Sequence, residues 1–213
     1  MRQRKIKDLD SKIEKLSGHI ADKDNKGKWR ELFQAPDDCG LYAEIGCGKG
    51  RFITDLAAAH PDNFYVGIEG HESVILRSLE KAEEAQLSNV VFIPEYIKDI
   101  REIFGEGELD GIYLNFSDPW PKARHEKRRL THRNFMKAYS EVIKPGGFIR
   151  FKTDNDGLFR FTLEEIEACG MKIAEQSLDL HSTDLDAKDT VTEYEERFIT
   201  CDTPIKYVKI EIV

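Results

Sequence analysis

Short apolar runs alternate with stretches of helical spacing along most of the chain. The apolar runs predict strands at Leu41–Ile45, Phe64–Ile68, Val90–Ile93, Gly111–Phe116, Phe148–Lys152, Lys172–Ser177 and Ile205–Val213. The stretches between them predict helices at Phe52–Ala59, His71–Gln86, Ile97–Phe104, Thr131–Ile143 and Leu158–Cys169. This alternation predicts an α/β fold with a doubly wound, mostly parallel sheet, whose ligands bind beyond the carboxyl ends of the strands.

The ends of the chain depart from this alternation. No helix is apparent directly before the last predicted strand, so we expect that strand to run antiparallel in a sheet of seven strands. Near the N-terminus, Trp29, Leu32 and Phe33 have helical spacing, and Thr131 is the expected N-cap of a later helix. We expect a single domain over residues 1–213, with residues 1–33 as a basic N-terminal extension.

Charge is distributed unevenly along the chain. The net charge is −8, from 32 basic and 40 acidic residues, which by itself disfavours a nucleic-acid partner. Met1–Arg30 nevertheless holds ten basic against five acidic residues, and Lys122–Arg133 holds six against one. Asp154–Val213 reverses this balance, with six basic against fifteen acidic residues. Two basic segments on an acidic body can therefore meet a polyanion along a restricted face.

Several classes of protein are excluded by what the sequence lacks. There is no apolar run of about 18 residues for a membrane span, and the N-terminus has no apolar segment of a secretory signal. The four cysteines show neither a C-x-x-C pair nor a histidine at metal-ligand spacing, which argues against structural zinc. Scattered thiols suit a reducing compartment, so we expect a cytoplasmic protein that needs no metal.

A glycine-rich turn follows the first predicted strand. The segment Glu44–Gly50 reads EIGCGKG, with Arg51 where the dinucleotide fingerprint would place its third glycine. Glu69 stands at the end of the second strand, where a carboxylate can accept hydrogen bonds from both ribose hydroxyls of an adenosine group. A merely tight strand-to-helix turn is the alternative. The turn and the acid together favour a nucleoside site.

The acid before the turn indicates which nucleoside cofactor is bound. NAD needs a seat for its pyrophosphate, and the carboxylate of Glu44 would oppose an anion there. S-adenosylmethionine carries a sulfonium cation and an ammonium group, which an acidic strand end suits better. The chain also lacks the G-x-x-x-x-G-K-[ST] motif, which excludes a P-loop nucleotidase.

The segment after the fourth predicted strand combines rigidity, an aromatic ring and basic charge. Two prolines in Asn115–Pro121 fix the backbone that carries Asp118 and Trp120. Trp120 offers a flat face for a base, and the basic run Lys122–Arg129 can follow a phosphate backbone. A buried tryptophan in a stiff loop beside a solvated charge run is the alternative.

The stretch YLNFSDPWPKARHEKRRLT, Tyr113–Thr131, resembles the signature of bacterial tRNA (guanine-N7)-methyltransferases. Further motifs similar to that family are AEIGCGKG, GIE, FKTDN, DLH, TEYEERF and the N-terminal KGKWRELF. The resemblance implies a Rossmann-like class I methyltransferase fold and S-adenosylmethionine as methyl donor. It implies methyl transfer to N7 of a guanosine in the variable loop of tRNA, at position 46 in tRNA numbering. The implied partner is tRNA, with the protein as a monomer or homodimer that requires no protein partner.

The same resemblance assigns roles to individual residues. The implied donor contacts are Glu44, Gly46, Gly48, Glu69, Tyr96 and Asp118, with Asp118 also catalytic. The implied substrate contacts are Lys122, Asp154, Thr192, Glu193, Tyr194 and Glu195. The implied RNA-facing residues are Arg124, His125, Glu126, Lys127, Arg128 and Arg129. One position departs from the family: relatives usually offer Asp or Asn where this chain has Tyr96, so Glu95 or a backbone group is an alternative contact to adenine.

The chemistry of guanine N7 fits a site rich in carboxylates. N7 carries a lone pair and no proton, so it can attack the methyl group in line, without a general base, once it is positioned. Fixed carboxylates then stabilise the charge that develops on the purine, and the candidates are Asp118, Asp154 and Glu193. The alternatives are that Asp154 caps a helix and that Glu193 and Glu195 are solvated. For His181 we expect a structural hydrogen bond near the site.

Three other functions remain open from the sequence. A methyltransferase of the same fold acting on a small molecule or a protein would have no use for the basic segments. A non-catalytic RNA-binding protein with a degenerate donor site is kept open by the departure at Tyr96. An NAD oxidoreductase is disfavoured by Glu44 and Arg51. Labelled S-adenosylmethionine and unmodified tRNA in one assay would separate all three from the family's reaction.

Overall fold

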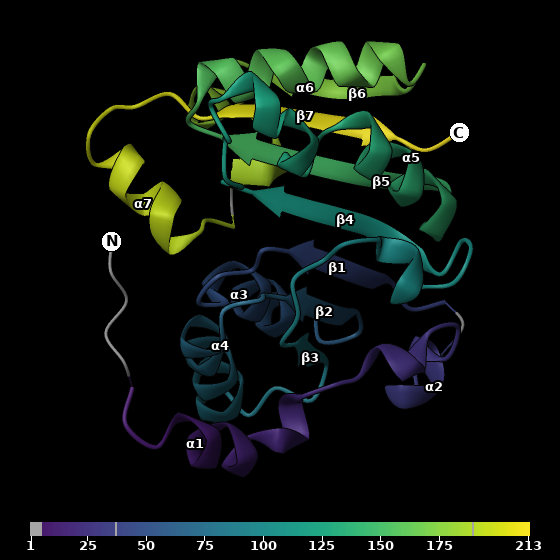
Figure 1. Ribbon diagram of the computed structural model, residues 1–213, viewed down its shortest axis with the longest axis vertical. Helices are drawn as coiled ribbons and strands as arrows, with labels where there is room; N and C mark the ends of the chain where they lie inside the picture. The colour runs from purple at the N-terminus through teal and green to yellow at the C-terminus, as the bar shows by residue number, and fades with distance from the viewer. Residues whose placement is uncertain (1–5, 37, 189) are drawn as a thin grey trace.

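The computed structural model describes residues 6–36, 38–188 and 190–213. Within these ranges seven strands form one sheet in the order β3-β2-β1-β4-β5-β7-β6 (Figure 1). The strands are β1 (Leu41–Ile45), β2 (Phe64–Ile68), β3 (Val90–Ile93), β4 (Leu109–Asn115), β5 (Ile143–Thr153), β6 (Lys172–Ser177) and β7 (Lys206–Glu211). Strands β1 to β5 pair in parallel, and β7 runs antiparallel to both of its neighbours. This confirms the predicted seven-stranded, mostly parallel sheet with an antiparallel last strand.

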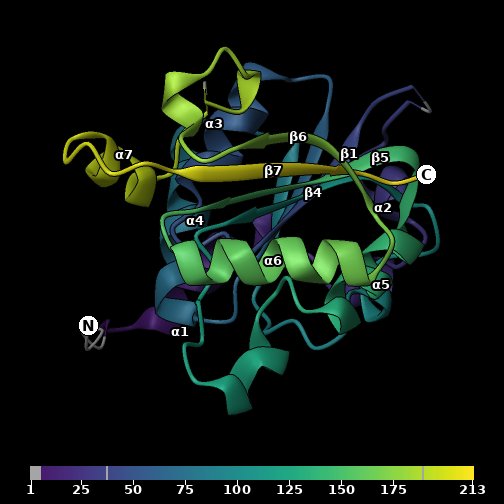
Figure 2. The same ribbon diagram turned by 90° about the horizontal axis from the view of Figure 1, so that it is seen from above.

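Helices cover both faces of the sheet. They are α1 (Leu9–Lys15), α2 (Trp29–Leu32), α3 (Arg51–Ala59), α4 (Glu72–Glu84), α5 (Arg133–Val142), α6 (Asp156–Ala168) and α7 (Glu193–Ile199). Figure 2 shows α3 and α6 on opposite sides of the strands. The structure therefore confirms the doubly wound arrangement that the alternation of elements predicts.

Two apolar layers explain why even β3, at the edge of the sheet, is a continuous apolar run. In β3, Val91 and Ile93 join the core that includes the buried faces of α5 and α6. Val90 and Phe92 point to the other side and join the core beneath α3 and α4. Successive side chains of a strand alternate between faces, so a strand covered on both sides needs apolar residues at every position.

The described part of the N-terminal extension is packed into this fold. Trp29 is fully buried, and its indole Nε1 donates to the carbonyl oxygen of Ile103 at 2.9 Å. Ile20 forms a bridge with Phe92 of β3, and the backbone N–H of Ala21 donates to the same residue. Residues 1–5 of the expected extension lie outside the described residues. That the whole chain acts as one domain stays a prediction.

Two local predictions about helices are wrong. The expected helix Ile97–Phe104 is only a single 3₁₀ turn, Ile100–Glu102, in which the side chain of Asp99 accepts from the backbone N–H of Arg101. The N-cap of α5 is His132, whose ring Nδ1 accepts from the backbone of Asn134 at 3.2 Å. Thr131 instead shares a buried hydrogen bond of 2.8 Å with Thr162 and so links α5 to α6.

The approach to the last strand differs from the prediction as well. The antiparallel direction of β7 is confirmed, but the reason given for it is wrong, because helix α7 (Glu193–Ile199) precedes that strand. Strand β5 also begins at Ile143, five residues earlier than expected, and Ile143 pairs with Leu109. Leu109 and Gly111 pair with Ile143 and Phe148, and the register shift between them accommodates the extra residues of β5. Among the described residues no helix has the length and apolar character to span a membrane.

Candidate active site at the carboxyl edge of the sheet

Two cavities lie where the parallel strands end. The larger, about 810 Å³, is lined by residues that follow β2, β3 and β4, including Glu69, Tyr96 and Asp118. The smaller, about 270 Å³, lies between the glycine turn after β1 and helix α7, which sits at this edge of the sheet in Figure 1. Gly46 and Phe116 line both cavities, so the two are neighbours. This is where a doubly wound sheet is expected to bind ligands.

The glycine turn bends the chain from β1 into α3. Gly46, Gly48 and Gly50 have φ angles of 75°, 58° and 77°, a left-handed backbone that side chains disfavour. At Gly50 a Cβ would also lie 2.6 Å from Ser78 of α4. At Gly46 and Gly48 no described atom lies within 4 Å of an added Cβ, because their exposed sides face the cavities. A ligand can thus approach the backbone closely.

Glu44 is buried beside the smaller cavity, with 2% of its surface exposed. Its Oε1 accepts from Nδ2 of Asn115 at 2.8 Å, while Oε2 has no hydrogen-bond partner among the described residues. Burial raises the pKa of Glu44 to about 7, although the Asn115 hydrogen bond and the charge of Lys152 oppose the shift. A buried carboxylate oxygen without a partner is suited to accept from a bound ammonium group.

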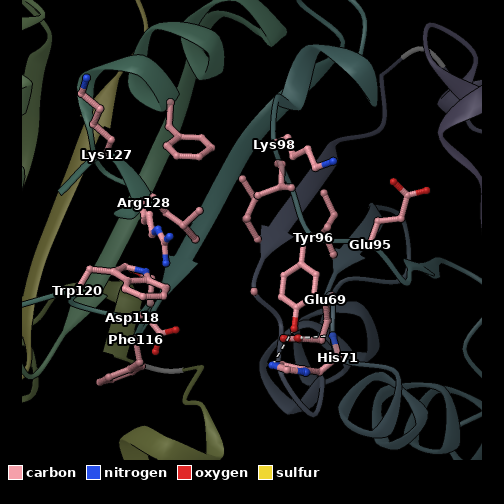
Figure 3. Close-up of a pocket in the computed structure, with 18 residues that line it drawn as sticks. Glu69, His71, Glu95, Tyr96, Lys98, Phe116, Asp118, Trp120, Lys127 and Arg128 are labelled. Carbon is pink, nitrogen blue, oxygen red and sulfur yellow. Dashed lines mark hydrogen bonds between the residues drawn. The ribbon is translucent and has the colours of Figure 1, made fainter. Parts of the chain in front are cut away.

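Glu69 and Tyr96 form one wall of the larger cavity (Figure 3). The backbone N–H of His71 donates to Oε1 of Glu69 at 2.9 Å, and that of Gly48 donates to Oε2 at 3.2 Å. Tyr96 is 62% exposed, and its hydroxyl lies 2.8 Å from Nε2 of His71. Backbone donors therefore fix the carboxylate of Glu69, and its remaining lone pairs can accept from ribose hydroxyls.

Asp118 and Trp120 form the opposite wall, with Phe116 and Arg128 (Figure 3). Phe116 and Trp120 have φ angles of 50° and 40°, uncommon for residues with side chains. Arg129 holds this strained segment, since its guanidinium donates to the carbonyl oxygens of Pro119 at 3.0 Å and Trp120 at 3.1 Å. The exposed carboxylate of Asp118 is thus carried by a rigid backbone.

The predicted RNA-facing run divides into two kinds of residue. Exposed members are Arg124, Glu126, Lys127 and Arg128, and His125 is half-buried against the ring of Trp120. Arg128 also stacks over Trp120, at 4.9 Å from the ring centroid. Arg129 uses its guanidinium within the fold and packs over Phe161 at 4.2 Å. Most of the basic charge remains available to a ligand, whereas Arg129 shapes the segment.

Helix α7 supplies one wall of the smaller cavity through Thr192, Glu193 and Tyr194. Burial raises the pKa of Glu193, but the ammonium groups of Lys81 and Lys49 outweigh burial and lower the pKa overall. Tyr194 is 52% exposed. The structure therefore brings these three predicted substrate contacts to the glycine turn.

The remaining predicted site residues lie elsewhere. Glu195 is fully buried and faces the protein interior, where His181 lies 2.9 Å from its Oε1, confirming the structural hydrogen bond expected of His181. Asp154 is half-buried after β5 and, like the exposed Lys122, does not line either of the two cavities. Asn155 caps α6, so the alternative that Asp154 is its cap is wrong. Substrate contacts by Asp154, Lys122 and Glu195 stay predictions.

Known proteins resemble this chain over most of its length. Residues 39–208 match a family described as a putative methyltransferase. A tRNA (guanine-N(7)-)-methyltransferase of Halalkalibacterium halodurans is 46% identical over 175 residues, which cover 81% of this chain and 77% of that protein. The enzyme of the same name from Clostridium acetobutylicum is 45% identical over 190 residues, 89% of each chain. The chain belongs to the tRNA (guanine-N7)-methyltransferase family. Enzymes of this family take their methyl group from S-adenosylmethionine.

Solved structures confirm the class I methyltransferase fold. An antibiotic-related methyltransferase superposes with a TM-score of 0.62 at 20% identity, over 89% of this chain and 93% of that one. A SAM-dependent methyltransferase from Aquifex aeolicus superposes with a TM-score of 0.56 at 15% identity, over 98% and 100% of the two chains.

The residues at the carboxyl edge fit S-adenosylmethionine. Glu44 offers a buried, unpartnered carboxylate oxygen for its ammonium group. Glu69 offers an oriented carboxylate for the ribose, and the open glycine turn lets the methionine part approach the backbone. No group of three or more His, Cys, Asp or Glu side chains in the described ranges is arranged to hold a metal ion.

Two residues beside the site did not emerge from the sequence as candidates. Asn115 of β4 and Lys152 of β5 are register partners in the sheet, and both are buried. Asn115 orients Glu44, and Lys152 lies close enough for its charge to lower the pKa of that carboxyl group. The available signal was a polar residue at the end of an otherwise apolar strand, where burial requires a partner.

Proposed function

We propose that this protein transfers a methyl group from S-adenosylmethionine to N7 of a guanosine in the variable loop of tRNA. The observation that supports this best is the meeting of three carboxylates, Glu44, Glu69 and Asp118, around two neighbouring cavities beside a basic segment. Relatives at 43% to 46% identity are named tRNA (guanine-N(7)-)-methyltransferases.

The chain holds the donor through residues of three strand ends. S-adenosylmethionine, when bound, supplies an electrophilic methyl group on a sulfonium. Glu44 accepts from its ammonium group, and Glu69 accepts from its ribose hydroxyls. The backbone at Gly46 and Gly48 lines the path between the two cavities. Tyr96 takes the adenine side, where its exposed ring offers a stacking face in place of a carboxylate.

Catalysis then depends on position and charge. Guanine N7 has an in-plane lone pair and no proton to remove, so in-line attack needs no general base. The carboxylate of Asp118 faces the larger cavity and stabilises positive charge as it develops on the purine. It also accepts from the N1–H and N2–H edge of guanine, which adenine does not offer. Thr192, Glu193 and Tyr194 of the smaller cavity complete the base pocket. Asp154, which lines neither cavity, contacts the substrate from the end of β5.

The basic segment guides the RNA to this pocket. Lys122, Arg124, Lys127 and Arg128 are exposed and contact phosphates, while the stacked pair of Arg128 and Trp120 borders the cavity. His125 and Glu126 belong to the same 3₁₀ segment, Ala123–Arg128, and Arg129 keeps the preceding backbone in shape.

Nucleoside analysis of methylated tRNA tests this function. The protein is incubated with labelled S-adenosylmethionine and unmodified tRNA, and the RNA is then digested and the label located. We expect 7-methylguanosine in the variable loop. Label in another nucleoside or another part of the tRNA, or none at all after exhaustive incubation, would overturn the proposal.

A further inference from the structure

A buried ion pair joins the end of β5 to helix α7. Nζ of Lys152 lies 3.2 Å and 3.3 Å from the two carboxylate oxygens of Glu195, and the two side chains are 3% and 0% exposed. The same Nζ donates to the carbonyl oxygen of Thr190 at 2.9 Å. Nε2 of His181 lies 2.9 Å from Oε1 of Glu195, and the backbone N–H of Thr192 donates to Oε2 at 3.3 Å. Both carboxylate oxygens are therefore fully engaged inside the protein.

Such a pair is poorly explained by stability alone. Removing two charges from water carries a large desolvation cost, and apolar replacements of similar size are often as stable. Burial lowers the pKa of Lys152, against the effect of Glu195, so the ammonium group pays this desolvation. A buried ion pair with defined partners instead fixes one arrangement of the two elements that it joins.

The geometry that it fixes is the rotation of α7. Glu195 is the third residue of this seven-residue helix, and its side chain points into the protein. Successive residues of a helix are rotated by about 100°, so fixing Glu195 also fixes the directions of Glu193 and Tyr194. These two residues, with Thr192, form the cavity wall that faces the glycine turn.

The other contacts of α7 leave more freedom. Arg51 pairs with Glu196 at 2.5 Å, and Lys81 pairs with Glu193, but Glu196 is 57% and Glu193 34% exposed. Exposed pairs of this kind contribute little, and water competes for them. The apolar contacts are less directional: the ring of Phe116 lies 5.5 Å from that of Tyr194 and 6.0 Å from that of Phe198, centroid to centroid. Phe198 also packs against a small buried cluster that includes Ile205. The buried pair is the directional contact among these.

Lys152 also connects α7 to the donor side of the site. It is the register partner of Asn115, which donates to Glu44, and its charge lowers the pKa of Glu44. The ammonium group of Lys152 thus acts on Glu44, the proposed donor contact, and on helix α7, which faces the substrate.

We propose that Lys152 and His181 are positioning residues, which hold Glu195 inside the protein and so turn Thr192, Glu193 and Tyr194 toward the substrate nucleoside. This inference rests on the proposed function, because it assigns those three residues to the substrate of the same site. It gives Glu195 a role through α7 in place of a direct contact with RNA.

A double variant separates positioning from stability. Lys152→Met or Glu195→Gln alone leaves a buried group without its partner, so we expect a lower Tm for each. The double variant Lys152→Met/Glu195→Gln removes both charges and keeps the side-chain volumes, so its Tm recovers. If positioning holds, the KM for tRNA of the double variant still rises at least about tenfold, and the amides of α7 exchange hydrogen faster.

A control pair of the same two residue types joins the neighbouring strands β7 and β6. Lys209 of β7 pairs with Glu175 of β6 at 3.1 Å, and each side chain is 25% exposed. Lys209→Met/Glu175→Gln is expected to leave the KM for tRNA and the exchange of α7 unchanged. A double variant at Lys152 and Glu195 with wild-type KM and wild-type exchange would overturn the proposal.

His181 provides a second test that does not depend on the ion pair, because its side chain is 25% exposed and tolerates change. His181→Gln keeps an N–H donor for Glu195, whereas His181→Leu does not. We expect His181→Leu to raise the KM for tRNA several-fold and the KM of His181→Gln to stay close to the wild-type value. Equal KM values for both variants and the wild type would contradict the role of His181.

Hydrogen exchange of α7 reports on the positioning even if the wild-type protein does not methylate tRNA, so the two proposals can fail separately.

Discussion

The carboxylate of Glu44 lies at the end of a parallel strand, where burial removes water and Asn115 supplies one hydrogen bond. Because burial disfavours the charged form, it raises the pKa of Glu44 to about 7. A cation bound at the free oxygen would offset that cost. Ionised Glu44 is therefore unfavourable for the fold alone, and under the proposed function the ammonium group of the bound donor compensates for this cost.

Donor affinity should depend on the ionisation of Glu44. Below pH 7 the carboxyl group is mostly protonated and loses its attraction for an ammonium group, so binding weakens as the pH falls. We expect the affinity for S-adenosylmethionine to rise about tenfold between pH 5.5 and pH 7, measured by calorimetry. Glu44→Gln should bind more weakly and lack most of this rise. An equally steep profile in that variant would assign the titration to another group.

The same substitution should change stability in the opposite direction. A carboxyl group whose pKa is raised on folding binds more protons in the folded state, so stability falls as the pH rises from about 4.5 through about 7. Without donor, Glu44→Gln should therefore have a higher Tm than the wild type at pH 8 and a smaller difference at pH 5. A lower Tm for the variant at pH 8 would contradict this.

Asp118 is the residue whose chemistry should be easiest to isolate, because it is exposed and its loss leaves no buried group unpaired. Asp118→Asn keeps the shape and removes the charge. We expect kcat/KM to fall about 100-fold, a typical loss for one electrostatic stabiliser, with an unchanged Tm. Glu106→Gln changes an exposed carboxylate that precedes β4, at the opposite end of that strand from Asp118, and is the control. Near-normal turnover of Asp118→Asn would remove it from the mechanism.

Among the elements, the segment between β4 and α5 is the most constrained. Positive φ angles at Phe116 and Trp120 are maintained by the prolines and by the hydrogen bonds of Arg129 to this backbone. The exposed Arg124 makes no such contact with the segment's backbone among the described residues. Two arginines of one basic run should thus act on different steps.

Substituting each arginine separately tests this division. Arg129→Ala frees the segment that carries Asp118, so we expect kcat to fall at least about tenfold with a smaller change in tRNA affinity. Arg124→Ala removes one phosphate contact, so we expect weaker tRNA binding with kcat nearly unchanged. Filter binding and steady-state kinetics measure both. The reverse pattern, or identical effects of the two substitutions, would contradict the division.

The elements also differ in how far the sequence could predict them. Strands buried on both faces, such as β2 and β3, are continuous apolar runs, and their bounds were correct. Helix α7 is short and highly charged, so periodicity did not reveal it; the capping box of Thr192 and Glu195 was the signal that could have. The spacing of the apolar residues within Ile97–Phe104 predicts a helix. Ile100, Ile103 and Phe104 are indeed buried, but the backbone forms only a single 3₁₀ turn.

The sequence could predict which candidate residues gather at the carboxyl edge of the sheet, but not which residues pair with one another inside the protein. Glu44, Glu69 and Asp118 stand at strand ends, and topology alone brings strand ends together. The burial of Glu195 could not be foreseen, because its partner Lys152 lies 43 residues away and only the packed structure joins them. For the same reason the role of Arg129 was not separated from that of its neighbours.

At the scale of the whole molecule, charge is segregated. The net charge is −8, yet the run Lys122–Arg133 carries six basic residues against one acidic residue. Much of that run is exposed beside the larger cavity, while the acidic excess belongs to Asp154–Val213. A polyanion should therefore bind at the cavity mouth through few contacts, and its affinity should depend on salt.

Salt dependence tests how the molecule meets RNA. A variant with Arg124→Glu, Lys127→Glu and Arg128→Glu loses exposed basic side chains beside the cavity. We expect weaker tRNA binding and a weaker salt dependence. The negative slope of log K against log salt should become shallower by roughly one for each lost phosphate contact. An unchanged slope would mean that the RNA lies on another face.

The central claim is that the donor occupies the edge of the sheet where Glu44, Glu69 and Asp118 meet. The most direct measurement is a crystal structure of the protein with S-adenosylhomocysteine. We expect the amino group of the ligand within hydrogen-bond distance of Glu44, its ribose hydroxyls hydrogen-bonded to Glu69, and its sulfur facing the segment that carries Asp118. A ligand bound elsewhere, or bound there without contacting Glu44 and Glu69, would contradict it.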